Sequence, residues 1–336
     1  MDEAESTKRN RITLGRRALL AAAGGIALAG AGLDAIAGPT SGAPAAAARL
    51  LPAALGRFAG FEWLGNAGWR VTTPSSTILV DPYLSRFDTG FAAGRFAPNT
   101  PLSLSTAAID AALGAGAVSA VLVTHTHWDH FADVPHIAAT RGAMVYTTLT
   151  GYQLGQAMGL AAVQLAVVKG GEELHVGDAV VRVVRSLHSR TASGGLLFPG
   201  VRSAVAQTPA NIADLPEGDT LGFVIRRSVG DAGVLLLGAS DFEDHALAGL
   251  DVDTVALPLP SNDVTAGYVS RLMRVLEKPR TVVLVHWDDF ESPLRNPPRA
   301  SDATRSRIAD VAGEIARVSP RTRVVVPTYL RSMALL

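Results

Sequence analysis

Four side chains of metal-binding type lie within the segment THTHWDH, residues 124–130. They are His125, His127, Asp129 and His130, and they include three of the eight histidines in the chain. In an extended chain His125, His127 and Asp129 point to the same side, because successive side chains of a strand alternate. A following turn would bring the fourth side chain round to join them. Three imidazoles and a carboxylate are costly to bury without many hydrogen bonds or a cation. The segment therefore indicates a metal site.

Residues of the same type follow other predicted strands. Runs of five to eight Val- and Leu-rich residues are typical of strands buried on both faces. Ligands in α/β folds gather at one edge of the sheet, beyond the strand ends. Four such runs end within a few positions of a candidate ligand: residues 118–124 before His125, 179–186 before His188, 233–238 before Asp241 and 281–285 before His286. We therefore expect four separate strands to deliver ligands to one site.

The remaining elements give an α/β pattern. Residues 76–80 predict a further buried strand, and Asp133-Val134-Pro135 predicts a helix start with Asp133 as its cap. Apolar residues recur at helical spacing over 264–276 and 303–318, and Gly177-Asp178 marks the turn of a hairpin over 172–184. Two segments, 84–106 and 190–219, lack a regular pattern. Long irregular segments in a compact domain are usually lids, binding loops or disordered stretches.

Composition narrows the class of protein. Hydrophobic residues make up 48% of the 336 residues and charged residues 18%, which is typical of a packed globular chain. The formal net charge is zero, so nothing indicates the basic surface that nucleic-acid-binding domains usually carry. Cysteine is absent, which excludes disulfides, thiol catalysis and zinc–thiolate sites. Any bound metal must be held by His, Asp or Glu.

The N-terminal residues 1–48 have the pattern of an export signal. A basic region ending in Arg16-Arg17 precedes an Ala/Gly/Leu-rich stretch, and small residues of the cleavage type follow at 45–48. The arginine pair resembles a twin-arginine signal, which implies export of the folded precursor by that machinery. The apolar stretch, 18–33, is shorter than the roughly 20 residues that span a bilayer. We expect cleavage, a single domain over 49–336, and a periplasmic, envelope or extracellular location; retention as an anchor is the alternative.

Three segments carry a resemblance to a known family. THTHWDH matches the HxHxDH signature of the metallo-β-lactamase superfamily, and the later candidate ligands follow in the order that family uses. The segments WLGNAGWRV and ILVDPYLS resemble its ascorbate-6-phosphate lactonase-like branch, which is similar to the phospholipase-D-type enzymes that act on N-acyl phosphatidylethanolamine. The resemblance covers roughly residues 60–330. It implies a four-layer αββα sandwich, in which two mixed β-sheets pack face to face with helices on the outer faces.

The resemblance also implies two divalent metal ions. Zinc suits a His/Asp ligand set without sulfur, and manganese and iron accept similar ligands. Paired ions share a hydroxide that attacks the substrate, and Asp129 could orient or deprotonate that water. Oxygen-reducing diiron relatives have Glu at the position of His127, so the histidine favours hydrolysis. The implied ligands form three sets: His125, His127 and His188 for one ion, Asp129, His130 and His286 for the other, and Asp241 as the bridge between them.

Further residues are candidates for supporting roles. Asp81 follows a predicted strand and looks like a residue that supports ligands or fixes a loop. Asn66 stands where relatives of this branch often have His, and an amide cannot act as a comparable acid or base. His245 follows Asp241 closely and could reach the pocket. The irregular segments also carry arginines that could bind an anionic group: Arg86, Arg95, Arg190 and Arg202.

These features predict an exported, dinuclear metal-dependent hydrolase whose substrate is an ester, lactone or phosphodiester of a small molecule or lipid. One alternative is a phosphodiesterase that acts on lipid or nucleotide phosphodiesters. The other is an exported metal-binding protein with an idle site, although a decayed site would be expected to have lost a ligand.

Overall fold

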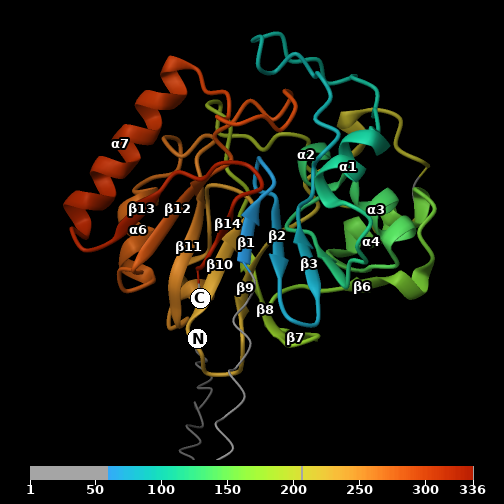
Figure 1. Ribbon diagram of the computed structural model, residues 1–336. Helices are drawn as coiled ribbons and strands as arrows, with labels where there is room; N and C mark the ends of the chain where they lie inside the picture. Colours follow the sequence, from blue (N-terminus) through green and yellow to red (C-terminus); the bar gives the residue numbers. More distant parts are fainter. Residues whose placement is uncertain (1–59, 206, 336) are drawn as a thin grey trace, which may run out of the picture. The chain divides into compact units, whose positions relative to one another are not determined.

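The structure, a computed structural model, describes residues 60–205 and 207–335 (Figure 1). The predicted export signal and its boundary at residue 48 lie outside these residues and stay predictions. Within the described residues no helix is both long and apolar enough to cross a membrane.

Two mixed seven-stranded sheets contain the described strands. Both sheets are antiparallel at one end and parallel at the other. In spatial order the first sheet consists of β14 (Ser332–Met333), β1 (Gly60–Trp63), β2 (Trp69–Thr72), β3 (Thr77–Val80), β4 (Ala120–Leu122), β5 (Met144–Thr147) and β6 (Leu165–Val167). The second consists of β13 (Arg323–Val325), β12 (Thr281–Val285), β11 (Val252–Pro258), β10 (Gly233–Leu237), β9 (Thr220–Arg226), β8 (Ala179–Ser186) and β7 (Glu173–Val176).

Helices lie on the outer faces of both sheets, as Figure 1 shows. The first sheet is covered by α1 (Thr106–Leu113), α3 (Val134–Arg141) and α4 (Leu149–Ala157), and the second by α6 (Tyr268–Val275) and α7 (Asp302–Val318). Shorter helices lie in the connections: α2 (Trp128–Phe131), α5 (Asp244–Leu247), and the 3₁₀ turns η1 (Ala162–Gln164) and η2 (Ile212–Asp214). The expected αββα sandwich is confirmed.

Apolar side chains from both sheets form one core between them. Trp63 and Ile78 of the first sheet belong to the same buried cluster as Phe223, Leu235 and Val283 of the second. All five residues of β10 and of β12 are buried, as their unbroken apolar runs predict for strands covered on both faces. Burial of the strands on both faces leaves their ends as the places where polar side chains can gather.

The element boundaries match the sequence pattern in most places. The hairpin over 172–184 is confirmed as β7 and β8, with Gly177 at φ 59° in the turn, where only glycine is free of strain. The helix expected over 264–276 begins later, at Tyr268, because Gly267 is left-handed and ends the preceding turn. Asp133 precedes α3 as expected, but its carboxylate does not cap the helix. It instead accepts hydrogen bonds from the backbone of Leu84 and Ser85.

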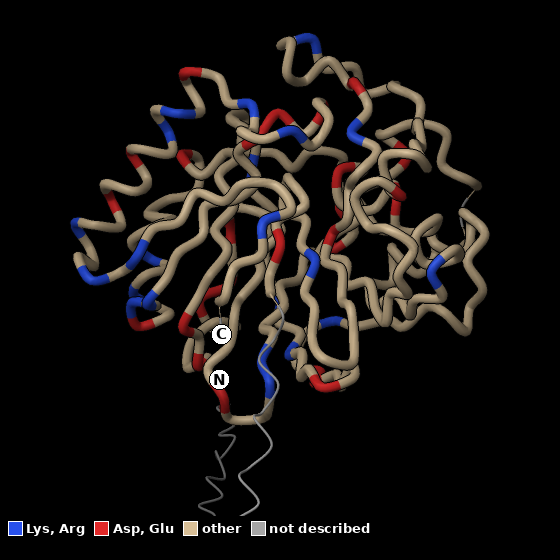
Figure 2. The backbone as a smooth tube through the Cα atoms, in the orientation of Figure 1, with Lys and Arg blue, Asp and Glu red and all other residues tan. Residues whose placement is uncertain are grey.

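Charged side chains are distributed without separation by sign. Figure 2 shows the positions of Lys and Arg interspersed with those of Asp and Glu along the described chain, including α7. This distribution agrees with the formal net charge of zero.

Candidate metal centre

The structure brings six of the seven predicted ligands together in two groups. The ligand atoms within each group lie within 4.8 Å of one another. We call them the histidine group and the carboxylate group: His125, His127 and His188 form the first, and Asp129, His130 and His286 form the second. The two groups are adjacent, because the rings of His125 and His130 have centroids 3.9 Å apart.

The ends of buried strands place these residues, as the sequence predicted. His125 and His127 follow β4, and α2 carries Asp129 and His130. The other two ligands follow β8 and β12 of the second sheet. The centre therefore lies where the two sheets end side by side, and both sheets contribute to it.

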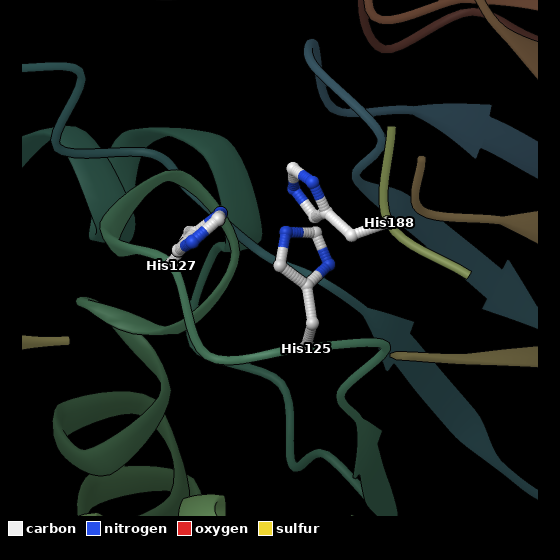
Figure 3. Close-up of side chains that lie close together, drawn as sticks. All are labelled: His125, His127 and His188. Carbon is white, nitrogen blue, oxygen red and sulfur yellow. The ribbon is translucent and has the colours of Figure 1, made fainter. Parts of the chain in front are cut away.

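The three rings of the histidine group lie close together in Figure 3. Each ring also has one nitrogen in a contact outside the group. His127 Nε2 lies 2.8 Å from the carbonyl oxygen of Leu197, and His188 Nδ1 lies 2.7 Å from that of Ser189. His125 Nδ1 lies 3.1 Å from Thr124 Oγ1, while its Nε2 is buried without a hydrogen-bond partner. Metal-binding histidines commonly donate from one nitrogen to a backbone oxygen and bind the metal through the other. The group thus fits a divalent ion.

The carboxylate group is held by two further polar residues. Asp81 Oδ2 lies 2.8 Å from His130 Nδ1, which leaves Nε2 facing Asp129 Oδ2 at 3.5 Å. His286 Nε2 lies 3.4 Å from the same oxygen. Asn66 Nδ2 donates to the backbone oxygen of Asp129 at 2.5 Å and to its Oδ2 at 3.2 Å. The structure thus places Asp81 and Asn66 directly against predicted ligands.

Burial sets the protonation states of the histidine group. It lowers the pKa of His125 well below the usual range, that of His127 to about 3 and that of His188 to about 4. Burial also opposes the charge of Asp129, but the neighbouring His130 and His286 outweigh it and lower the pKa of that carboxyl. Near pH 7 the three imidazoles are therefore neutral and Asp129 is ionised, which are the forms that bind a metal ion.

Asp241 does not lie where the bridging role requires it. Its Oδ1 accepts a hydrogen bond from Arg271 at 2.6 Å and another from the backbone N–H of Phe242 at 2.9 Å. It belongs to neither ligand group, and it does not line the cavity into which those groups open. The ion pair with Arg271 therefore engages Oδ1 of this carboxylate outside the two ligand groups. His245 also departs from expectation, because it is exposed on α5 and does not line the cavity.

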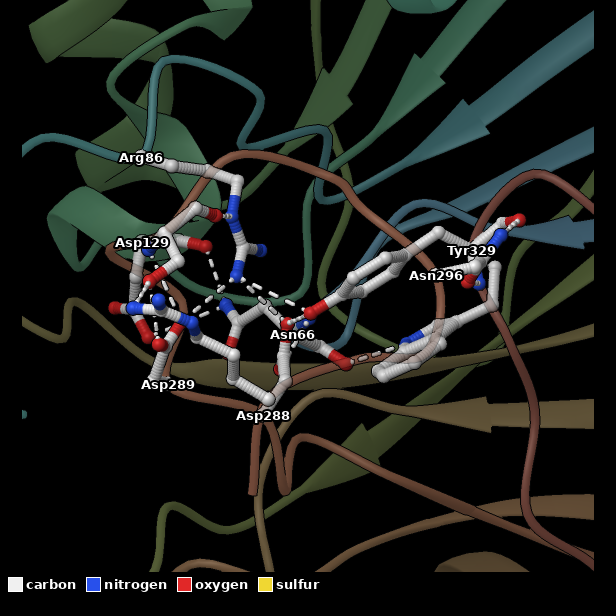
Figure 4. Close-up of polar contacts among 10 residues, drawn as sticks. Asn66, Arg86, Asp129, Asp288, Asp289, Asn296 and Tyr329 are labelled. Atoms are coloured by element: carbon white, nitrogen blue, oxygen red, sulfur yellow. Dashed lines mark hydrogen bonds and ion pairs between the residues drawn. The ribbon is translucent and has the colours of Figure 1, made fainter. Parts of the chain in front are cut away.

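A buried polar network behind Asp129 was missed by the sequence analysis (Figure 4). Asp288 Oδ2 accepts hydrogen bonds from Arg86 and from the hydroxyl of Tyr329, both at 2.8 Å. Asp288 Oδ1 accepts from the backbone N–H of Asn66 at 2.9 Å, and the side chain of Asn66 reaches Asp129. The sequence signal for this network was weak, since Asp288 and Arg86 are 202 positions apart.

The arginines expected to bind an anion have different environments. Arg86 is buried and paired with Asp288, so the expectation that it binds a ligand is wrong. Arg95 is exposed, Arg202 is half-buried, and neither lines the cavity beside the ligand groups. Arg190 does line it.

The ligand groups open into a cavity of about 490 Å³. Both irregular segments contribute to its wall: Phe91 and Phe96 come from 84–106, and Leu197 comes from 190–219. Asp133 and Glu291 hold the first of these segments in place, because both carboxylates accept hydrogen bonds from its backbone. The first segment is thus a fixed part of the wall over the metal ligands.

Comparisons with known proteins agree with this arrangement. The family model described as "Beta-lactamase superfamily domain" matches residues 60–286. A UPF0173 metal-dependent hydrolase from Myxococcus xanthus is 26% identical over 271 residues, which cover 79% of this chain and 79% of that protein. Two solved structures share the fold. A possible metal-dependent hydrolase from Veillonella parvula has a TM-score of 0.52 at 18% identity, and the match covers 83% of this chain and 100% of that protein. An isothiocyanate hydrolase from Delia radicum gut bacteria has a TM-score of 0.50 at 19% identity, and the match covers 81% of this chain and 98% of that protein.

The lowered histidine pKa values predict a pH-dependent stability of the metal-free protein. Between about pH 6.5 and pH 4 the unfolded chain binds protons at these histidines and the folded chain does not. Stability should therefore fall as the pH drops from 7 to 5. His130 contributes in the opposite direction, because Asp129 and Asp81 outweigh its burial and raise its pKa. Urea unfolding at the two pH values measures the difference, which should shrink in His127→Gln.

The matched control for this experiment is His175→Gln, since His175 is exposed on β7. It should leave the pH dependence unchanged. Equal unfolding free energies at pH 7 and pH 5 in the unsubstituted chain would contradict the assignment of neutral, buried imidazoles.

The Arg86–Asp288 pair predicts a large loss of stability when one partner is removed. Arg86→Met keeps most of the side-chain volume but leaves Asp288 as a buried carboxylate without its cation. Such a change costs about 3–5 kcal/mol of unfolding free energy. Arg95→Met in the same irregular segment should stay within about 0.5 kcal/mol, because Arg95 is exposed. Similar urea midpoints for the two variants would refute the prediction.

Proposed function

Because this chain belongs to the metallo-β-lactamase superfamily, we propose that it hydrolyses an uncharged ester or lactone whose apolar part fills the cavity over the ligand groups. The family comparison supports the enzyme class, a metal-dependent hydrolase. The apolar character of the cavity wall is the main observation that supports an uncharged ester or lactone as the substrate.

Aromatic side chains make up much of that wall. Phe91, Phe96, Trp128 and Phe290 all line the cavity. Their rings contact one another, with centroids 5.1 Å apart for Phe91 and Phe290 and 5.6 Å apart for Phe96 and Trp128. A wall of this kind binds a ligand by taking its apolar surface out of water. The cavity therefore suits a substrate with an aliphatic or aromatic group beside the bond that is cleaved.

The cations of the wall give little support to an anionic substrate. Arg307 donates to both carboxylate oxygens of Asp263, at 2.6 and 3.0 Å, so its charge is already paired. Arg190 is exposed and donates to the carbonyl oxygen of Gly194 at 3.0 Å. Phosphate groups are commonly recognised by bidentate arginine contacts. Among the described residues of the cavity wall, Arg190 is the cation that favours the alternative, a phosphodiesterase.

The residues of the centre have separable roles in this proposal. The two ligand groups would hold divalent metal, with zinc as the proposed ion, and a bound ion would supply a water of lowered pKa and polarise the carbonyl group. The neutral imidazoles provide lone pairs toward the cavity, and ionised Asp129 accepts a proton or orients water there. Asn66 fixes Asp129 by donating to its carboxylate.

A panel of substrates tests the proposal. Zinc-loaded protein should cleave p-nitrophenyl esters and lactones, with kcat/KM rising as the acyl chain lengthens from acetate to octanoate. It should cleave bis(p-nitrophenyl) phosphate far more slowly. Phe91→Ala should lower kcat/KM for the octanoate ester about tenfold and change the acetate ester little, because full burial of a Phe side chain contributes about 1.5–3 kcal/mol.

Leu104→Ala is the matched control, because Leu104 is an exposed apolar residue of the same segment that does not line this cavity. Faster cleavage of the phosphodiester than of any ester would favour the phosphodiesterase. Full metal loading without turnover of any member of the panel would favour an idle metal-binding site.

Export is part of the same proposal. It rests on the arginine pair, the apolar stretch and the small residues within 1–48. Replacing both Arg16 and Arg17 by Lys should retain the precursor in the cytoplasm, because the twin-arginine machinery reads that pair. Fractionation of cells that express the full chain measures the location. Unchanged export of the double variant would contradict a twin-arginine signal.

A further inference from the structure

The wall of the cavity offers no carboxylate that could link the two ligand groups. Among the described residues, only two acidic side chains line it, Asp129 and Asp288. Asp129 belongs to the carboxylate group. Both oxygens of Asp288 already accept hydrogen bonds, from Asn66, Arg86 and Tyr329, so this carboxylate is not free to bind a metal ion.

The strand end that was expected to supply the bridge presents an alanine instead. Gly238 and Ala239 follow β10 and line the cavity. The turn packs closely there, since a Cβ added to Gly238 would lie 2.0 Å from Thr124 Oγ1, beside His125. Asp241 comes two residues later and does not line the cavity.

Several contacts fix Asp241 in its present position. Its backbone oxygen accepts a hydrogen bond from Ser186 at 3.1 Å, and its carboxylate pairs with Arg271 at 2.6 Å. Arg271 is itself held by Asp244 at 3.1 Å and by the ring of Phe242, whose centroid lies 4.3 Å from the guanidinium carbon. Turning Asp241 toward the ligands would break this ion pair.

Two divalent cations in adjacent groups repel each other strongly. Their repulsion is four times that of two unit charges at the same separation, and it grows as the dielectric constant of the surroundings falls. Coordinated anions are what normally offset it. Here the six ligands supply one carboxylate, Asp129, and a second buried carboxylate, Asp81, lies 2.8 Å from His130 Nδ1. Both negative charges lie at the carboxylate group.

We propose that the centre binds divalent ions one at a time, with the carboxylate group binding the first ion tightly and the histidine group binding the second at least 100-fold more weakly. The histidine group is uncharged, and its outer nitrogens contact a hydroxyl and two backbone oxygens. It therefore has no charge to offset the repulsion from the first ion. This inference rests on the proposed metal-dependent function.

Zinc titration of the metal-stripped full chain at pH 7, with calorimetry and elemental analysis, tests the order of binding. One ion per chain should survive gel filtration, and a second should bind at least 100-fold more weakly. His286→Ala should lose the tight ion, whereas His188→Ala should keep it and lose the weak one. Two ions of equal affinity, or loss of the tight ion in His188→Ala, would overturn the proposal. Absence of any bound zinc would instead overturn the metal-dependent function itself.

Two further variants test the missing bridge. Ala239→Asp adds a carboxylate to the cavity wall and should strengthen binding of the second ion at least tenfold, whereas the uncharged Ala239→Asn should not. Asp241→Asn should leave both affinities within twofold, because Asp241 pairs with Arg271 and not with a ligand group. Loss of either ion in Asp241→Asn would show that this carboxylate is a ligand and would overturn the proposal, whether or not the Ala239 variants fold.

Discussion

The buried carboxylate of Asp81 is the contact on which the arrangement of the ligands depends. It accepts hydrogen bonds from the backbone N–H and the hydroxyl of Thr124 and contacts Nδ1 of His130. One side chain therefore ties the end of β3 to the end of β4 and to α2. Asp81 holds a left-handed backbone conformation, φ 42°, which is unfavourable for a residue other than glycine. Its three contacts offset that strain, and the same conformation recurs at Asn66 and at His286, φ 53° and 57°.

Asn66 shows why an amide suits this position. Its backbone N–H donates to Asp288 and its side-chain amide donates to Asp129, so one residue satisfies two buried carboxylates. Asn adopts the left-handed conformation at lower cost than most residues. An imidazole can hydrogen-bond as well, but it would change its charge with pH next to two acids. The amide instead keeps the charge beside Asp129 independent of pH. The charges of Arg86 and Asp288 behind it still balance each other.

The sequence predicted the parts of the centre that depend on local pattern. Val- and Leu-rich runs identified β4, β8, β10 and β12, and the residues just beyond three of them include the ligands His125, His188 and His286 of the two groups. Asp241 satisfied the same positional rule, yet the guanidinium of Arg271, 30 residues later, holds its carboxylate. The pairing of Arg86 with Asp288, 202 positions apart, likewise could not be predicted from the sequence pattern. Such pairings depend on how α6 and the irregular segments pack, and strand periodicity does not specify that packing.

The charge of the centre and the character of the cavity wall both support the uncharged, partly apolar substrate that we propose. One divalent ion in the carboxylate group would be balanced by the charges of Asp129 and Asp81, which leaves the centre close to neutral. A neutral centre exerts little attraction on an anionic substrate, and the paired charge of Arg307 adds little more. In the proposed function, affinity would then come from apolar contact with Phe91, Phe96 and Trp128. The position of Asp241 and the aromatic wall are independent observations, and both favour an uncharged substrate with an apolar group.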